Sequence, residues 1–110
     1  MATKIIKQAI LFEVEDYSGI PVRTNETYWK KIKTEKHKEL SVEKDAVIRT
    51  IQHPDDVYKS VQDEFIRLFY RKINGNTLVV VVKYINNTGF VVTCYEISNV
   101  KRKGEKLWPM

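Results

Sequence analysis

Cysteine and histidine are scarce in this chain of 110 residues, which has one cysteine and two histidines. A lone cysteine forms no internal disulfide, and these three residues do not have the spacing of a zinc site. We therefore expect neither a metal nor a cofactor. Cys94 lies among apolar residues in a predicted strand, and we interpret it as a small buried hydrophobic residue rather than a nucleophile.

Long apolar segments are also missing. The longest apolar run, Leu78 to Val82, is far too short to cross a bilayer. The beginning of the chain, Met-Ala-Thr-Lys-Ile-Ile-Lys, does not have the apolar stretch of a signal peptide. These absences predict an intracellular, cytoplasmic protein that has no membrane partner.

Positive charge is in excess. There are 19 Lys and Arg against 14 Asp and Glu, which gives a net charge of +5. Such an excess favours a polyanionic partner, most simply nucleic acid, although it also serves solubility alone. With 43% hydrophobic residues, the chain can bury a core of ordinary size, and we expect residues 1–110 to form a single domain.

Two turn signals in the second half of the chain predict an antiparallel meander. Asn74-Gly75 and Asn86-Asn87 separate three segments of strand-forming residues, 65–73, 77–84 and 90–97. Both pairs tolerate the positive φ angles that a two-residue hairpin turn requires.

Two-residue turns fix the register and therefore the two faces of the meander. One predicted face carries Arg67, Phe69, Arg71, Leu78, Val80, Val82, Val91, Thr93 and Tyr95. The other carries Ile66, Leu68, Tyr70, Val79, Val81, Lys83, Phe90, Val92 and Cys94. The second set is almost entirely apolar, so we expect it to face the core and the first set to form the floor of a site.

The first half of the chain predicts a strand over residues 8–15 and helices over residues 27–38 and 42–52. Residues 55–59 are extended or a short edge strand, and residues 101–108 form a basic tail. The expected fold is therefore α+β, with an N-terminal strand and two helices packed on a twisted antiparallel β-meander.

The order of several short motifs resembles a known family. They are Arg23-Thr24, Trp29, Ile32, His37-Lys38-Glu39-Leu40, Pro54-Asp55-Asp56-Val57, Leu68-Phe69-Tyr70-Arg71, the strand through Thr93-Cys94-Tyr95, and Lys103-Gly104-Glu105 before Trp108. In this order they resemble the barnase/EndoU/colicin/RelE-like (BECR) superfamily, whose small members are often associated with phages or toxins. The family usually reads His-Pro-Glu where this chain reads His37-Lys38-Glu39.

The resemblance implies a RelE/barnase-like fold and metal-independent cleavage of RNA, in which a ribose 2′-hydroxyl attacks the adjacent phosphate. Matched by position, His37 would shuttle the proton, Arg71 would clamp the phosphate, and Thr93 and Tyr95 would complete the catalytic pocket. The resemblance also makes an antitoxin or immunity protein a candidate partner.

Basic side chains supply the candidate RNA contacts, and these are Lys36, Arg67, Lys83, Lys101, Arg102 and Lys103. Each candidate also has a simpler interpretation. His37 near a helix C-terminus suits the helix dipole, Arg71 could be a solvated strand arginine, and Thr93 and Tyr95 are ordinary strand formers. No carboxylate is obviously paired with His37, so a catalytically silent module that binds RNA or protein is the alternative function. A purely structural protein is the third.

Overall fold

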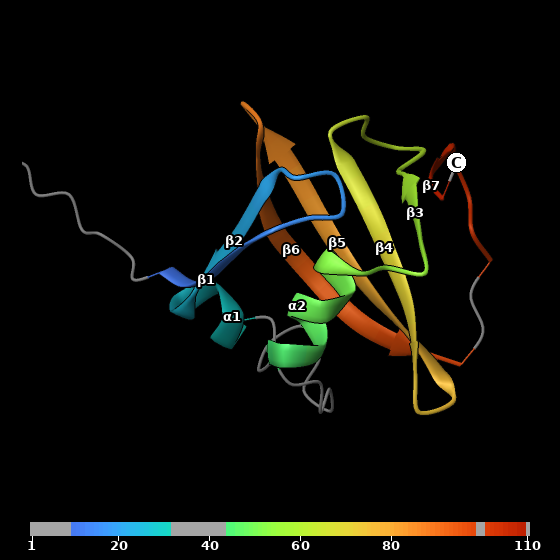
Figure 1. Cartoon of the computed structure of the whole chain (residues 1–110), viewed down its shortest axis with the longest axis horizontal. Coiled ribbons are helices and arrows are strands. Elements are labelled where there is room, and N and C mark those ends of the chain that lie inside the picture. Colours follow the sequence, from blue (N-terminus) through green and yellow to red (C-terminus); the bar gives the residue numbers. More distant parts are fainter. Residues whose placement is uncertain (1–9, 32–43, 99–100, 110) are drawn as a thin grey trace, which may run out of the picture.

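The computed structural model describes residues 10–31, 44–98 and 101–109, and within them a twisted seven-stranded mixed sheet carries two short helices (Figure 1). The strands are β1 (Ile10–Glu15), β2 (Pro21–Asn25), β3 (Asp56–Lys59), β4 (Ile66–Ile73), β5 (Asn76–Ile85), β6 (Thr88–Ile97) and β7 (Lys106–Trp108). The helices are α1 (Glu26–Lys31) and α2 (Lys44–Gln52). Across the sheet the order is β1-β2-β6-β5-β4-β3-β7.

The predicted fold class is wrong. In place of two helices packed on an antiparallel meander, the chain forms a mixed sheet in which β2 runs parallel to β6. Residues 21–25 form a strand of their own, and β7 pairs outside β3. Of the two helices in the described part of the chain, α2 has nine residues and α1 has six. The remainder of the predicted first helix lies outside the described residues.

The meander itself has the predicted turns. Asn74 and Gly75 have φ angles of 47° and 82°, and Asn86 and Asn87 have φ angles of 54° and 61°. These left-handed conformations are those of a two-residue hairpin turn, which matches the right-handed twist of the flanking strands. β4 therefore pairs with β5, and β5 with β6, as the sequence predicts.

A β-bulge in β6 shifts the predicted register by one residue. Val82 lies opposite Val91, but Val81 lies opposite Thr93, so Val92 is the extra residue. Beyond the bulge Val80 lies opposite Cys94, and Val79 lies opposite Tyr95. Without the bulge, the two-residue turn would place Thr93 opposite Val80 and Tyr95 opposite Leu78. Because side chains alternate along a strand, a shift of one residue moves Thr93 and Tyr95 to the opposite face.

The core lies on the face opposite to the one predicted. We call this the inner face, and its fully buried members are Phe69, Leu78, Val80, Val82, Val91 and Cys94. The prediction of the core face was wrong because both faces of the meander are apolar. The elements that cover one of them, α2 and the β1–β2 hairpin, lie elsewhere in the sequence. Cys94 reaches the inner face through the bulge and is completely buried there, as its interpretation as a buried hydrophobic residue requires.

Helix α2 covers the inner face with one apolar side. Val47 and Ile51 are completely buried, as the predicted apolar stripe requires, and Thr50 is buried beside them. The Thr50 hydroxyl donates a 2.8 Å hydrogen bond to the carbonyl of Ala46, so its polar group is satisfied inside the helix. The helix ends at Gln52, just before His53 and Pro54, because a residue that precedes proline avoids helical geometry.

The β1–β2 hairpin folds over the same inner face. Its turn is built around the Asp16 carboxylate, which accepts hydrogen bonds from the backbone N–H groups of Ser18 (2.7 Å) and Ile20 (3.0 Å). The hydroxyl of Tyr84 donates a 2.6 Å bond to the second oxygen of the same carboxylate. This bond joins the hairpin to the end of β5, and both residues are buried.

Aromatic contacts connect the β1–β2 hairpin to the opposite edge of the sheet. The Tyr17 ring packs edge-on against Phe69 with centroids 5.7 Å apart, and its centroid lies 5.6 Å from that of Trp108 in β7. The two ends of the strand order thus approach each other over the inner face. The sheet therefore curves around its own core.

Neither α1 nor α2 is both long enough and apolar enough to cross a bilayer.

Replacing Tyr84 by phenylalanine tests the bond to Asp16. We expect the free energy of unfolding to fall by about 1.5–3 kcal/mol, because a hydrogen bond to a buried carboxylate is lost. Urea unfolding of the wild type and of Tyr84→Phe measures the difference. Tyr58→Phe is the matched control, since the described structure gives the Tyr58 hydroxyl no hydrogen bond, and its effect should stay below about 0.5 kcal/mol. Equal effects of the two variants would contradict the proposed importance of this bond.

Alkaline pH tests the same bond in another way. Burial first, and the bond to Asp16 second, raise the pKa of Tyr84 far above its ordinary value. This raised pKa contributes fully to the unfolding free energy below pH ~10, the ordinary pKa of tyrosine in the unfolded chain. The contribution is lost as pH rises further, because the unfolded state then releases a proton that the folded state retains. We expect the decline in unfolding free energy above pH ~10 to be shallower in Tyr84→Phe, by up to about 1.4 kcal/mol per pH unit. Unchanged slopes would contradict this assignment.

Candidate nucleic-acid interface

The predicted catalytic residues do not converge among the described residues. His37, and with it Lys36, lies outside the described residues. Arg71 is on the inner face, where its Nη1 donates a 2.6 Å hydrogen bond to the carbonyl of His53, just after α2. Thr93 and Tyr95 lie on the opposite face as a result of the bulge. Arg71 therefore ties β4 to the segment that follows α2, and it does not share a surface with the other two.

Arg67 also points to the inner face. Its guanidinium lies 4.4 Å from the centre of the Tyr84 ring, and its Nη1 lies 3.4 Å from the Tyr17 hydroxyl. Arg67 and Lys83 border a hollow of about 620 Å³ at the end of the sheet, together with exposed Phe65. The position of Arg67 is thus explained by its contacts with the hairpin and with Tyr84.

The basic tail is attached to the sheet through Arg102. Its Nε and Nη2 donate hydrogen bonds of 3.1 and 3.2 Å to the two oxygens of Asp56. Its guanidinium also lies 4.4 Å from the centre of the Tyr70 ring. Lys101 and Lys103, on either side of it, are exposed. Arg102 therefore holds the tail over the sheet, and its neighbours present their charges to solvent.

The sheet face opposite α2 brings the remaining candidates together, and we call it the outer face. Three rows of paired residues cross it: Tyr70, Val79 and Tyr95; Leu68, Val81 and Thr93; and Ile66, Lys83 and Phe90. Val79 and Tyr70 are buried, but most of the other members are half-buried, and Phe90 is 40% exposed. No described helix packs on this face.

Aromatic and cationic side chains alternate on the outer face. Arg23 in β2 lies beside Phe90 in β6, with its guanidinium 5.6 Å from the centre of the ring. Lys83 is the neighbour of Phe90 on the other side, in β5. With Arg102 over Tyr70, each end of this face has a cation close to an aromatic ring.

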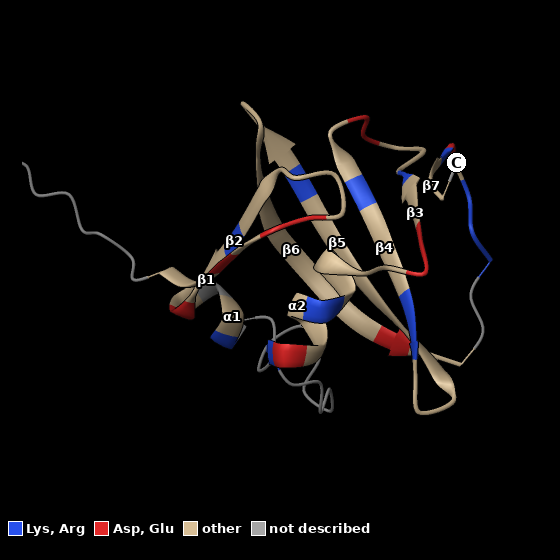
Figure 2. Ribbon diagram, viewed as in Figure 1, with Lys and Arg blue, Asp and Glu red and all other residues tan. Residues whose placement is uncertain are grey.

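Each of these cations has an acidic partner. Arg23 lies 3.4 Å from Glu13, Lys83 lies 3.3 Å from Asp63, and Arg102 is held by Asp56. Along the ribbon, Figure 2 shows basic positions on β2 and β5 and acidic positions on β1, before β3 and in the loop before β4. The outer face is therefore a mixed surface, and it is not uniformly positive.

The tyrosines of the outer face are neutral at physiological pH. Burial raises the pKa of Tyr95 above its ordinary value, and burial is also the main cause of the raised pKa of Tyr70. A neutral phenol offers an aromatic ring and a hydroxyl donor, and it does not repel a phosphate. Tyr95 therefore suits contact with a nucleic acid.

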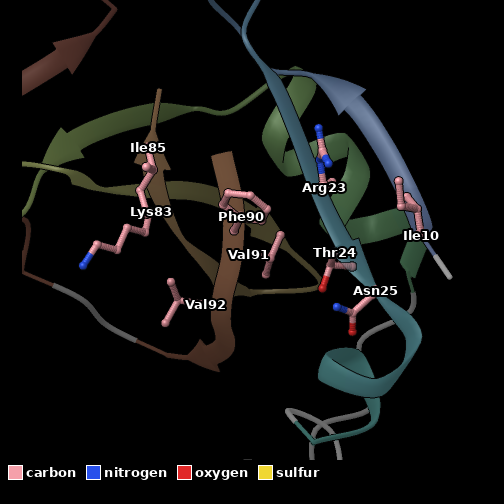
Figure 3. Close-up of a pocket in the computed structure, with 9 residues that line it drawn as sticks. All are labelled: Ile10, Arg23, Thr24, Asn25, Lys83, Ile85, Phe90, Val91 and Val92. Atoms are coloured by element: carbon pink, nitrogen blue, oxygen red, sulfur yellow. The ribbon is translucent and has the colours of Figure 1, made fainter. Parts of the chain in front are cut away.

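A cavity of about 470 Å³ opens beside the outer face, between β2 and β6 (Figure 3). Thr24 and Asn25 project toward it from β2, and Phe90, Val91 and Val92 line it from β6. Its lining also includes Ile10, Arg23, Lys83 and Ile85.

Sequence reasoning missed the contribution of β2 and of Phe90. Phe90 was predicted to face the core, and Arg23 and Thr24 were assigned no role in the site. Asn86-Asn87 predicts the β5–β6 turn, but no local sequence pattern predicts the parallel pairing of β2 with β6 that places Arg23 beside Phe90.

Among residues 10–31, 44–98 and 101–109 there is no group of three or more His, Cys, Asp or Glu side chains that could hold a metal ion.

The chain matches no protein-family model, and neither the curated proteins nor the solved structures give a significant match. Any function must therefore be argued from the geometry of the outer face and of the adjoining cavity.

Proposed function

We propose that the protein is an RNA-binding module that holds a single strand on the outer face of its sheet. Phe90 and Tyr95 would stack on bases, Thr93 would donate or accept hydrogen bonds between them, and Arg23 and Lys83 would contact phosphates. The supporting observation is the arrangement of these side chains in successive rows of one sheet face that carries no described helix.

The spacing of the aromatic residues supports stacking. Phe90, Thr93 and Tyr95 occupy three successive rows along β6, and the bulge at Val92 keeps all three on one face. With about 3.4 Å of rise per residue, neighbouring rows are ~7 Å apart, so Phe90 and Tyr95, two rows apart, are separated by ~14 Å with Thr93 between them. RNA-binding sheets of other proteins likewise present aromatic side chains that stack two or three bases of an unpaired strand. Stacking of this kind tolerates different sequences because every base has a π-face.

The ion pairs on this face do not prevent phosphate binding. The Arg23–Glu13 and Lys83–Asp63 pairs are both substantially exposed to solvent. Exposed ion pairs contribute only about 0–1 kcal/mol each, so a phosphate can replace a carboxylate at small cost. The chain's net charge of +5 adds a longer-range attraction for a polyanion.

RNA cleavage does not form part of this proposal. Cleavage through a cyclic phosphate needs a proton acceptor and a group that stabilises the phosphorane next to the same phosphate. Arg71, the predicted clamp, is engaged with the His53 carbonyl on the inner face. Binding without turnover requires only the outer face.

Tyr95→Ala tests the proposal. We expect the dissociation constant for a fluorescently labelled octauridylate to rise roughly five- to a hundredfold, because a lost base stack corresponds to ~1–3 kcal/mol. Tyr95→Phe is the matched control, since it keeps the ring and removes only the hydroxyl, and it should bind within about threefold of the wild type. Fluorescence anisotropy at low salt, about 50 mM, measures both variants where phosphate contacts are strongest.

Two outcomes would overturn this proposal. Absence of wild-type binding at low salt would exclude an RNA-binding role, as would equal affinities of Tyr95→Ala and the wild type. The same samples, incubated in EDTA, should return the RNA intact. Products that end in a cyclic phosphate would instead establish cleavage and show that binding alone is not the function.

A further inference from the structure

The cavity between β2 and β6 exists because these strands pair over a very short distance. Only Val22 with Gly89 and Arg23 with Phe90 are paired. A Cβ atom at Gly89 would lie 2.8 Å from the Val82 side chain and 2.9 Å from that of Val22, so glycine permits the close approach at this point. After Asn25 the chain turns into α1, whereas β6 continues through Val91 and the bulged Val92. The strands separate, and the cavity lies between them (Figure 3).

One polar group in the wall of this cavity has no partner. Thr24 is only 4% exposed, and its Oγ1 is buried without a hydrogen bond to any described residue. Figure 3 shows the hydroxyl directed toward the space between β2 and β6. Buried hydroxyls are nearly always hydrogen-bonded, because removal from water without a replacement partner is unfavourable. A ligand that supplies the missing partner would be stabilised by it.

The rest of the lining defines the chemistry of the ligand. Val91, Val92 and Ile85 make apolar walls, and the Phe90 ring lies where the cavity meets the outer face. Arg23 and Lys83 are the cationic lining residues. A volume of about 470 Å³ is within the range of small-ligand sites. A planar ring with apolar faces, a polar edge and a nearby phosphate fits these surroundings, whereas a purely apolar ligand would leave the Thr24 hydroxyl unpaired.

We propose that this cavity receives one unstacked nucleobase of the bound RNA strand, and that the Thr24 hydroxyl hydrogen-bonds to the edge of that base. This inference rests on the proposed function, because Phe90 belongs to both surfaces and would direct the strand from the outer face into the cavity. Reading the polar edge of a base that has left the stack is how proteins recognise single-stranded RNA by sequence. The outer face would then supply general affinity, and the cavity would supply preference for one base.

The test uses the four nucleoside 5′-monophosphates as probes of the full chain. We expect at least one of them to shift the backbone amide NMR signals of Thr24, Val91 and Val92 in a saturable way. Thr24→Val removes the hydroxyl at nearly constant volume, and it should weaken that mononucleotide about fivefold or more, the effect of one hydrogen bond. Thr24→Ser, which keeps the hydroxyl, is the matched control, and its loss of mononucleotide affinity should be less than half of that of Thr24→Val.

Folding and binding are separable in this experiment. Because the Thr24 hydroxyl has no described partner, Thr24→Val should melt at the same temperature as the wild type or higher. A lower melting temperature would show that the hydroxyl is already satisfied and would overturn the proposal.

The two proposals can also fail independently. Octauridylate binding that depends on Tyr95, with no mononucleotide shifting the signals of the cavity, would exclude the base pocket and leave the outer face intact. Saturable mononucleotide binding at Thr24, with no binding of octauridylate, would support the pocket and exclude the outer face as an RNA platform. Perturbation by a fatty acid but by no nucleotide would assign the cavity to apolar ligands and overturn the inference.

Discussion

The hydrogen bond between the Tyr84 hydroxyl and the Asp16 carboxylate attaches the β1–β2 hairpin to the inner face of the sheet. It joins residues 68 positions apart in the chain and is buried at both ends. The same carboxylate organises the β1–β2 turn, so the bond attaches a preformed hairpin to the end of β5. With the hairpin in place, Tyr17 reaches Phe69 and Trp108, and the sheet curves over α2. The hairpin and α2 together cover one of the two apolar faces of the meander, and that face is the interior.

Closure on the inner face has consequences for the outer face. A sheet that is curved around its core has one face packed by a helix and a hairpin, and the other is left with half-buried aromatic and aliphatic residues. The bulge at Val92 then adds Thr93 and Tyr95 to that second face and moves Cys94 into the core. Bulges change the direction of side chains in this way, and they are common near functional sites. The surface proposed to bind RNA is thus produced by the same packing that stabilises the fold.

Local signals made part of this structure predictable. The Asn-Gly and Asn-Asn turns, the pairing of β4 with β5, and the buried stripe of α2 follow from side-chain chemistry within a few residues. The bulge, the parallel pairing of β2 with β6, and the choice of inner face depend on contacts between distant segments, such as Tyr84 with Asp16. A single unpaired residue, Val92, was enough to separate Arg71 from Thr93 and Tyr95, although both turns were predicted correctly. The predicted register would have placed these three residues on one face, and the bulge is the reason that they do not share it.

The base pocket depends on Thr24, whose buried hydroxyl lacks a described hydrogen-bond partner at a cost to the stability of the free protein. In the free protein its hydroxyl is buried without a described partner beside an open cavity, an arrangement that a valine at this position would avoid. Proteins retain such locally unfavourable groups where function requires them, and they compensate elsewhere in the fold. Beside Thr24, the close approach of Val22, Val82 and Gly89 holds β2 against β6 just before the strands separate. The proposed contact between Thr24 and a base would therefore break no hydrogen bond of the Thr24 hydroxyl, because that hydroxyl has no described partner to lose.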